Sequence, residues 1–349
     1  MTGKGYFTKN LLTWNATENT RIMPWKGEKD PYKIWISEII LQQTRVEQGL
    51  GYYNRFISTF PNVKSIALAK EDEVFKVWEG LGYYSRCKNI ISSARFIFNE
   101  LGNKFPNDYE GLISLKGIGQ YTASAIASFA YSLPYAVTDG NVFRVLSRFF
   151  GIDIPIDTAE GKTFFLRLAN KLIDKKDPAT YNQAIMDFGA MICKPVPLCP
   201  FCPLKTRCVA FNKGLVDVLP VKVKRIVKRH RWIYYLVIEY NKKLYLRKRT
   251  GKDVWENLYE FVPIESATKL TPNALLKTPD FKNIFNISEH RIDDISKIYQ
   301  QQLTHQTISG RFVRITSSVP LALREYTLTS YKQLLQLPFP KFISTYLKD

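Results

Sequence analysis

The sequence lacks the features of two large classes of protein. It has no run of 18 or more apolar residues, which a helix needs to span a bilayer. The stretch from Met1 to Asp30 contains no apolar core of a secretory signal. We therefore expect a cytoplasmic protein, in which the few cysteines, five among 349 residues, are reduced rather than paired in disulfides.

Acidic residues are also scarce, because 31 Asp and Glu stand against 50 Lys and Arg and leave a formal net charge of +19. A folded protein with this charge repels itself unless it binds a polyanion, and nucleic acid and an anionic membrane surface are the two candidates. Since no segment spans a membrane, nucleic acid is favoured, and we expect a nucleoid-associated protein. Hydrophobic residues make up 45% of the chain, which excludes disorder as its main state.

The length predicts about two domains, and the hydrophobic pattern changes near residue 220. Before that point apolar residues recur at helical spacing and predict an all-α region over residues 1–218. The expected helices run from Ile34 to Pro61 and over 63–80, 87–101, 109–132, 141–150, 159–173 and 179–193. Residues 219–230 predict a basic linker, because VKVKRIVKRHR (221–231) holds six basic residues and no acid. It is either a solvated linker or one that also lies along a phosphate backbone, and both can hold at once.

After the linker the pattern alternates with period two, as in strands. WIYYLVIEY (232–240) and LYLRKR (244–249) predict a hairpin, and TISGRFVRITSSV (307–319) predicts a later strand. Ser330 is expected to cap a short final helix over 331–337. Residues 231–349 therefore predict a smaller α/β domain.

The strongest chemical signal is a group of four cysteines, Cys193, Cys199, Cys202 and Cys208, spaced C-x5-C-x2-C-x5-C. Four thiols so close together in a reduced protein predict a metal site, and the spacing alone leaves zinc and an iron–sulfur cluster both open. Cys87 stands apart and is expected to be a core or surface thiol.

The segment LKGIGQYTASAIA (115–127) places Gly117 and Gly119 between two helical stretches. Glycines at such a junction let backbone N–H groups face an anion at the start of the next helix, as in a helix–hairpin–helix that holds DNA phosphate. An ordinary helical turn explains the same residues, but the net charge favours phosphate.

Two acids occupy positions that suggest a function. Glu38 lies within the apolar stretch WISEIIL, where a charge is costly to bury and has to be paired or functional. Asp139 begins DGNVFRVL, and an Asp at this place is also a common helix cap or turn residue. Residue chemistry alone leaves a structural and a functional role open for each of the two acids.

A further group of aromatic and amide side chains suits contact with a base stack near a phosphate clamp. Tyr83 and Tyr84 lie beside Arg86, and Gln42 and Gln43 follow the first acid by one helical turn. Exposed residues of this kind can wedge between stacked bases, whereas Tyr84 suits a helical core almost as well.

Six segments, in order over residues 20–210, resemble the adenine DNA glycosylases (MutY) of the helix–hairpin–helix, endonuclease III-like superfamily. They are MPWKGEKDPYKIWISEIILQQTRV, WEGLGYYSR, LKGIGQYTASAI, VTDGNVFRVLSR, YNQAIMDFGAMIC and the cysteine group. The resemblance implies an α+β multidomain protein, whose all-α glycosylase region has a six-helix barrel and an iron–sulfur lobe that includes the N-terminal helix. It also implies base excision repair, in which adenine opposite 8-oxoguanine or guanine is flipped out of double-stranded DNA and removed.

The same resemblance implies roles for individual residues. Glu38 would be the general acid that protonates adenine N7, Asp139 would stabilise the cationic sugar, and Asn141 would help to hold that region. Tyr121 stands where bifunctional relatives carry a Schiff-base lysine, and since a phenol has no amine we expect a monofunctional enzyme. The remaining matches are Trp25, Lys26 and Gln183 near the adenine pocket, Gln43, Leu81 and Tyr83 as wedges at the mispair, and the four cysteines as ligands of a [4Fe–4S] cluster.

Elementary chemistry agrees with these roles. Adenine leaves poorly as an anion, so the general acid has to be protonated near neutral pH. The neighbours Ile36, Ile39 and Ile40 would raise the pKa of Glu38 in that direction. The departing base leaves a cationic sugar, which a fixed, ionised Asp139 would stabilise.

The C-terminal region resembles the MutT-like (Nudix-like) domain with which the family senses 8-oxoguanine. VWENLYEF (254–261) and LTHQ (303–306) carry this likeness. Thr304 keeps a hydroxyl that could bond the oxidised base, His305 matches a histidine of the family that is either functional or structural, and Leu303 replaces an aromatic residue. No Nudix box is present, so nucleotide hydrolysis is not expected.

Three features depart from the family pattern: five residues rather than six separate the first two cysteines, Lys116 replaces a proline, and Lys26 replaces the usual arginine. The alternatives are a bifunctional pyrimidine-damage glycosylase/lyase, a DNA-binding cluster protein without chemistry, and a nucleotide-pool hydrolase. Tyr121 and the long C-terminal region argue against the first, the pair of acids against the second, and the missing Nudix box against the third. We expect a monomer.

Overall fold

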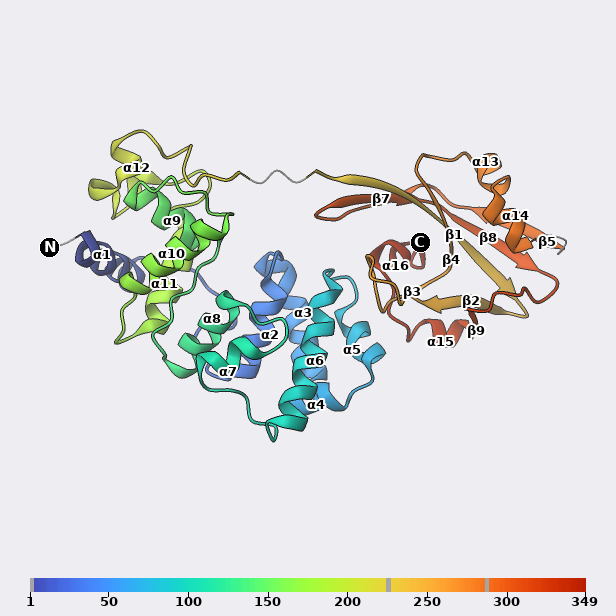
Figure 1. Cartoon of the computed structure of the whole chain (residues 1–349), viewed down its shortest axis with the longest axis horizontal. Coiled ribbons are helices and arrows are strands. Elements are labelled where there is room, and N and C mark those ends of the chain that lie inside the picture. Colours follow the sequence, from blue (N-terminus) through green and yellow to red (C-terminus); the bar gives the residue numbers. More distant parts are fainter. Residues whose placement is uncertain (1–2, 224–226, 286–288) are drawn as a thin grey trace. The chain divides into compact units, whose positions relative to one another are not determined.

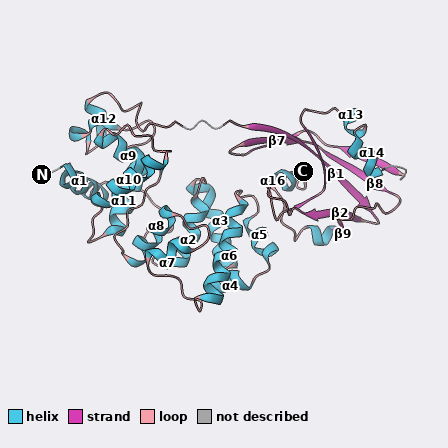
Figure 2. Ribbon diagram, in the orientation of Figure 1, coloured by secondary structure: helices cyan, strands magenta, loops and turns pink. Residues whose placement is uncertain are grey.

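The computed structural model describes residues 3–223, 227–285 and 289–349 (Figure 1). As predicted, the part before residue 220 is helical, and the strands of the described residues all follow it (Figure 2). The helices of this part are α1 (Gly3–Thr17), α2 (Pro31–Leu41), α3 (Val46–Thr59), α4 (Val63–Leu68), α5 (Glu71–Trp78), α6 (Tyr84–Glu100), α7 (Tyr109–Ser114), α8 (Gln120–Tyr131), α9 (Gly140–Phe150), α10 (Ala159–Leu172), α11 (Pro178–Met191) and α12 (Val209–Asn212), with short 3-10 turns at Cys199–Phe201 and Lys205–Arg207.

Three of the predicted helices are each two helices in the structure. Gln43 adopts the left-handed backbone (φ 58°) between α2 and α3, and Gly117 (φ 83°) turns the chain between α7 and α8. Glu73 accepts the backbone N–H of Lys70 at 3.1 Å and so begins α5 separately from α4. An apolar pattern continues across such short turns, and for that reason the spacing of apolar residues did not show the breaks.

The chain packs as two units that are discontinuous in sequence. One comprises Met1–Ala67 with Ser92–Lys224, and the other comprises Leu68–Ile91 with Arg225–Asp349. The second unit thus includes α5 and the first turns of α6, which sequence reasoning placed in the helical region. The predicted domain boundaries around the linker stay a prediction, and its residues 224–226 lie outside the described residues.

Polar contacts tie α5 and α6 to the C-terminal part of their unit. Asp72 accepts hydrogen bonds from Lys248 Nζ at 2.6 Å and from the Tyr259 hydroxyl at 2.9 Å. Lys88 of α6 pairs with Glu256 at 2.8 Å. These contacts join positions more than 160 residues apart, so no local pattern announces them.

Nine strands of the described residues form a mixed sheet in the second unit. They are β1 (Arg229–Tyr240), β2 (Lys243–Lys248), β3 (Tyr259–Glu260), β4 (Val262–Ser266), β5 (His290–Ile295), β6 (Tyr299–Gln302), β7 (Gln306–Gly310), β8 (Phe312–Ser317) and β9 (Thr327–Ser330). The long strand β1 pairs antiparallel with β4 and β2, and parallel with β7 and then β8. The predicted hairpin of residues 232–249 is confirmed as β1 and β2.

Two predictions for this unit need correction. The single strand expected over 307–319 is two strands, because the chain passes Gly310 so close to β1 that an added Cβ would lie 1.7 Å from the Ile233 carbonyl oxygen. Ser330 caps α15 (Tyr331–Leu334) as predicted, but that helix stops earlier than expected. The next N–H groups, of Gln336 and Leu337, bond to carbonyls three residues back, as in tight turns rather than an α-helix. Helix α15 is also not the final helix, since α16 (Lys341–Tyr346) follows; α13 (Pro272–Leu276) and α14 (Pro279–Phe285) lie between β4 and β5.

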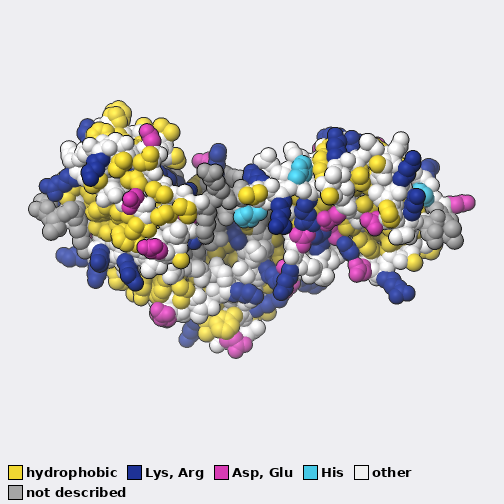
Figure 3. Space-filling view, turned by 45° about the horizontal axis from the view of Figure 1, so that its top comes forward, with side chains coloured by type: hydrophobic (Ala, Val, Ile, Leu, Met, Phe, Trp, Pro, Cys, Tyr) yellow, Lys and Arg dark blue, Asp and Glu magenta, His cyan; other side chains and the backbone are white. Residues whose placement is uncertain are grey.

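Each unit has its own hydrophobic core. Trp14 and Phe188 are buried in the first, and Leu236 and Ile315 in the second. In the described part of the chain, no helix combines the length and the apolar character that crossing a bilayer requires. Lys and Arg side chains are spread over both units on the face drawn in Figure 3, so the excess positive charge is not confined to the linker.

Candidate active site

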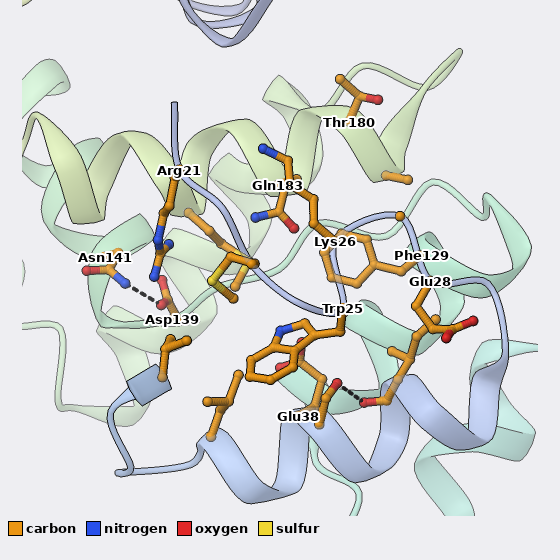
Figure 4. A pocket seen from close by; sticks show the side chains of 18 of the residues that line it. Arg21, Trp25, Lys26, Glu28, Glu38, Phe129, Asp139, Asn141, Thr180 and Gln183 are labelled. Carbon is orange, nitrogen blue, oxygen red and sulfur yellow. Dashed lines mark hydrogen bonds between the residues drawn. The ribbon is translucent and has the colours of Figure 1, made fainter. Parts of the chain in front are cut away.

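A cavity of about 430 Å³ opens in the first unit between α2, α8, α9, α11 and the segment that joins α1 to α2. Seven residues singled out from the sequence line it: Trp25, Lys26, Glu38, Tyr121, Asp139, Asn141 and Gln183. They come from separate stretches of the chain, and the fold brings them together (Figure 4). Met23 and Phe129 add an apolar lining, so the cavity offers a ligand apolar walls together with a few polar groups.

Glu38 projects from α2, a largely buried helix that begins at the Asp30 cap and Pro31. Its carboxyl group accepts a hydrogen bond from the Tyr121 hydroxyl at 2.7 Å. Burial raises the pKa of Glu38 to about 7, the bond from Tyr121 opposes this rise, and the charge of Asp139 adds to it. A carboxyl group with this pKa is protonated in a large share of molecules at neutral pH and can donate to a base.

Asp139 caps α9, and its carboxylate accepts the backbone N–H of Val142 and the side-chain Nδ2 of Asn141, both at 2.8 Å. Burial raises the pKa of Asp139, while these bonds and the charge of Arg144 act to lower it. The donors hold the carboxylate in one orientation at the edge of the cavity. Asp139 therefore combines the two roles that residue chemistry left open, helix cap and pocket acid.

Two residues that sequence reasoning did not single out hold Asn141 in place. Arg144 Nη2 donates to the Asn141 side-chain oxygen and to the Gly189 carbonyl, both at 2.8 Å, and Arg144 Nε donates to the Cys193 carbonyl at 2.7 Å. Gly189 packs so tightly that an added Cβ would lie 2.7 Å from Asn141 Cβ. Nothing in a single sequence distinguishes this arginine and this glycine from others on helices.

Asp187 on α11 is a third residue that sequence reasoning missed. Its side chain is fully buried, and it pairs with Arg21 at 2.8 Å and with Lys26 at 3.3 Å. It also accepts hydrogen bonds from Gln183 Nε2 and Asn19 Nδ2, both at 2.9 Å. A signal for it was present, because it is the lone acid of YNQAIMDFGAMIC.

The residues predicted to wedge at a mispair lie outside the cavity. Gln43 belongs to the first unit, whereas Leu81 and Tyr83 belong to the second. Leu81 is buried, Tyr83 is 41% exposed, and both Gln43 and Tyr83 (φ 49°) hold the left-handed backbone that non-glycine residues rarely adopt. The Tyr83 hydroxyl lies 2.5 Å from that of Thr304, so two residues from distant segments meet. His305, which follows Thr304 in the sequence, is exposed.

The predicted hairpin joins α7 to α8. Gly117 needs its positive φ of 83°, which glycine adopts at little cost, and Gly119 precedes the first turn of α8. Since Gly119 has no side chain to cap that turn, the first N–H groups of α8 stay open to an anion.

The predicted metal ligands, Cys193, Cys199, Cys202 and Cys208, line one small cavity of the first unit together with Arg148. None of the four is in a disulfide. Burial raises the pKa of Cys193 and Cys208 and raises that of Cys202 to about 12, so thiolates here call for a positively charged partner.

The four cysteines that share this cavity are residues of the kind that hold metal centres through thiolate ligands. Within the described ranges, no three His, Cys, Asp or Glu side chains converge as ligands of a single metal ion. A four-iron cluster bonds each cysteine to a different iron and does not require such convergence. Arg148 Nη1 lies 3.7 Å from Cys193 Sγ, where its charge favours an anionic sulfur.

Residues 36–168 match the family model described as HhH-GPD superfamily base excision DNA repair protein. A thermostable thymine-DNA glycosylase is similar in structure, with 27% identity and a TM-score of 0.56, over 60% of this chain and 97% of that one. A non-covalent endonuclease III–DNA complex, at 20% identity, TM-score 0.51 and coverage of 62% and 99%, shares the fold. The hairpin, the buried acids and these matches define a base excision DNA repair protein of the helix–hairpin–helix class.

Curated relatives narrow this class. The adenine DNA glycosylase of Buchnera aphidicola subsp. Schizaphis graminum (strain Sg) is 36% identical over 264 residues, which are 75% of this chain and 76% of that protein. The adenine DNA glycosylase of Mus musculus is 38% identical over 227 residues, 61% of this chain and 44% of that protein. The chain belongs to the adenine DNA glycosylase family. Its predicted family and enzyme class, a hydrolase of N-glycosyl bonds in DNA repair, are thereby confirmed.

Proposed function

We propose that this enzyme removes adenine mispaired with 8-oxoguanine or guanine in double-stranded DNA. Its relatives are named adenine DNA glycosylases. The observation that carries the proposal is the cavity in which the raised pKa of Glu38 and the fixed carboxylate of Asp139 occur together. A base in a duplex reaches such a cavity only when it is flipped out of the stack.

The two acids divide the chemistry between them. Glu38 gives its proton to adenine N7 as the glycosidic bond breaks, so the electron pair of that bond leaves with a neutral base. The sugar becomes cationic, and Asp139, held by Asn141, stabilises that charge. Water then adds its oxygen to C1′ and returns one proton to Glu38. The reaction is glycoside hydrolysis with a nucleobase as the leaving group.

We propose a monofunctional enzyme, because Tyr121 offers a phenol where a lyase needs an amine. The amines that line the cavity are engaged elsewhere: Lys26 pairs with Asp187, and Lys29 Nζ donates to the Phe129 carbonyl at 3.0 Å. Borohydride added during turnover is therefore expected to trap no stoichiometric protein–DNA adduct, and such an adduct would contradict the proposal.

We propose that the C-terminal sheet is a MutT-like domain that senses the base opposite adenine, with Thr304 and His305 facing it and Gln43, Leu81 and Tyr83 wedging at the mispair. The contact between the Tyr83 and Thr304 hydroxyls supports a shared role. Thr304→Val is expected to lower the preference for 8-oxoguanine over guanine, whereas Thr304→Ser keeps the hydroxyl and the preference. An equal preference in wild type and Thr304→Val would remove Thr304 from recognition.

We further propose that the four cysteines hold a [4Fe–4S] cluster, which would cross-link the loop over residues 193–208. The Gly117–Gly119 turn would bind DNA phosphate, supported by the net charge of +19. The proposed domains are residues 1–218 and 231–349, joined by the linker 219–230, and the proposed state is a monomer associated with the nucleoid.

Single-turnover excision tests the main proposal. Duplexes would carry adenine opposite 8-oxoguanine, guanine or thymine, or a thymine glycol, with alkali to reveal abasic sites and an alkali-free lane for strand cleavage. Excision confined to mispaired adenine, seen only after alkali, is the expected result. Cutting at thymine glycol, or binding with no excision at all, would overturn the proposal.

A further inference from the structure

The buried carboxylate of Asp187 determines which way the Gln183 amide faces. An ionised carboxylate only accepts hydrogen bonds, so the group of Gln183 that lies 2.9 Å from Asp187 Oδ1 has to be its NH2. The amide oxygen of Gln183 is thereby left for the cavity, which Gln183 lines (Figure 4). The cavity wall opposite α2 therefore presents an acceptor, not a donor, at this point.

The other partners of Asp187 keep this arrangement from rotating. Its Oδ1 also accepts from Arg21 at 2.8 Å, and its Oδ2 accepts from Asn19 at 2.9 Å and from Lys26 at 3.3 Å. Four donors occupy the roughly four acceptor positions of the carboxylate. Three of these donors, Asn19, Arg21 and Lys26, lie in the segment that joins α1 to α2, so their bonds to Asp187 hold this segment against α11.

We propose that Asp187 is the positioning residue that sets the enzyme's choice of base, through Gln183. An outward amide oxygen accepts a hydrogen bond from the amino group that adenine carries at C6. Hypoxanthine carries an oxygen at C6 instead, so the amide oxygen of Gln183 faces a second acceptor and neither oxygen gains a hydrogen bond. The inference rests on the proposed function, because it assumes that the flipped base enters this cavity.

Substitution of Asp187 by asparagine tests the inference, because asparagine can both accept and donate. The Gln183 amide is then able to face either way, and both purines find a partner. In Asp187→Glu the side chain is still a carboxylate and only accepts hydrogen bonds, so the Gln183 amide keeps its orientation. Asp177→Asn, at the exposed cap of the same helix, is the matched control. The quantity measured is the ratio of single-turnover rates for adenine and hypoxanthine opposite the same base, with the melting temperature and the pH profile of each variant.

The adenine-to-hypoxanthine ratio is expected to fall by about tenfold or more in Asp187→Asn and to stay near the wild-type value in Asp187→Glu and Asp177→Asn. The pH profile should not move, since Glu38 is untouched. A ratio within about twofold of wild type in Asp187→Asn would overturn the inference, including when both rates fall together with the melting temperature, which would mark a structural role only.

A second variant keeps the inference testable if Asp187→Asn does not fold. Gln183→Met removes the amide but leaves Asp187 paired with Arg21 and Lys26. This variant is also expected to lose the preference for adenine over hypoxanthine, and a preserved ratio of the two rates would overturn the inference. Wild-type enzyme that excises no adenine at all would instead refute the proposed function, so the two failures are distinguishable.

Discussion

Glu38→Gln is expected to stabilise the folded protein while it abolishes excision. Glutamine keeps the size of the side chain and can still accept the hydrogen bond from Tyr121, which is 2.7 Å long in the structure. It has no carboxyl proton to donate, so adenine would have to leave as an anion. Binding of mispaired DNA should stay nearly unchanged, because the variant alters no phosphate contact.

The stability gain follows from the pKa of the buried carboxyl group. In the fold this pKa is raised from 4.5 to about 7, so the folded state binds the proton more tightly than the unfolded chain does. Ionisation of buried Glu38 therefore destabilises the folded wild type. This destabilisation is absent well below pH 4.5, grows as the pH rises to about 7, and is constant above it. At 1.36 kcal/mol per pKa unit, Glu38 destabilises the wild type by about 3 kcal/mol at pH 8 and by about 1 kcal/mol at pH 5.

Unfolding measurements at both pH values check this reasoning. The variant should exceed the wild type in stability by more at pH 8 than at pH 5, while the exposed Glu47→Gln on α3 serves as control and should change stability by no more than about 0.5 kcal/mol. A Glu38→Gln variant no more stable than wild type at pH 8 would refute the assignment of a buried acid with a raised pKa. A variant that still excises adenine would refute its role as proton donor.

Three further outcomes are expected. Tyr121→Phe removes a hydrogen bond that lowers the pKa of Glu38, so the pH above which single-turnover excision declines should move upward; an unchanged profile would contradict this. Gly189→Ala places a methyl group against Asn141 and should slow excision by about tenfold or more with DNA binding retained, which rate and binding assays on one preparation would show or disprove. Cys202→Ser should lower the iron content and the visible absorbance of the purified protein, and full retention of both would argue against a cluster at this loop.

Local signals account for what the sequence predicted well. Ser330 was expected to cap a helix and does so, because a cap acts within three residues. A cap was one of the roles open for Asp139, and it caps α9. Glu38 stood out because a charge among isoleucines is costly, and the structure buries it. These arguments need only the immediate neighbours of a residue.

Long-range contacts account for what was missed. Asp187 is explained by partners such as Asn19, which lies 168 positions away, and no local pattern encodes such a pairing. Gly189 is required by the close approach of α9, which depends on how two helices pack. The apolar pattern of α5 likewise says that one face is buried, but not against which part of the chain.

The grouping of Leu68–Ile91 with the C-terminal sheet has a consequence for how the protein can be divided. The chain passes between the units three times, and the crossing after Ile91 lies in the middle of helix α6. A fragment that stops at residue 218 keeps Asp72 but loses Lys248 and Tyr259, and a fragment that starts at 231 keeps those two and loses Asp72. A cut at the linker therefore separates Asp72 from both of these partners, and an exchange of the sheet between homologues keeps the contacts only if α5 is exchanged with it.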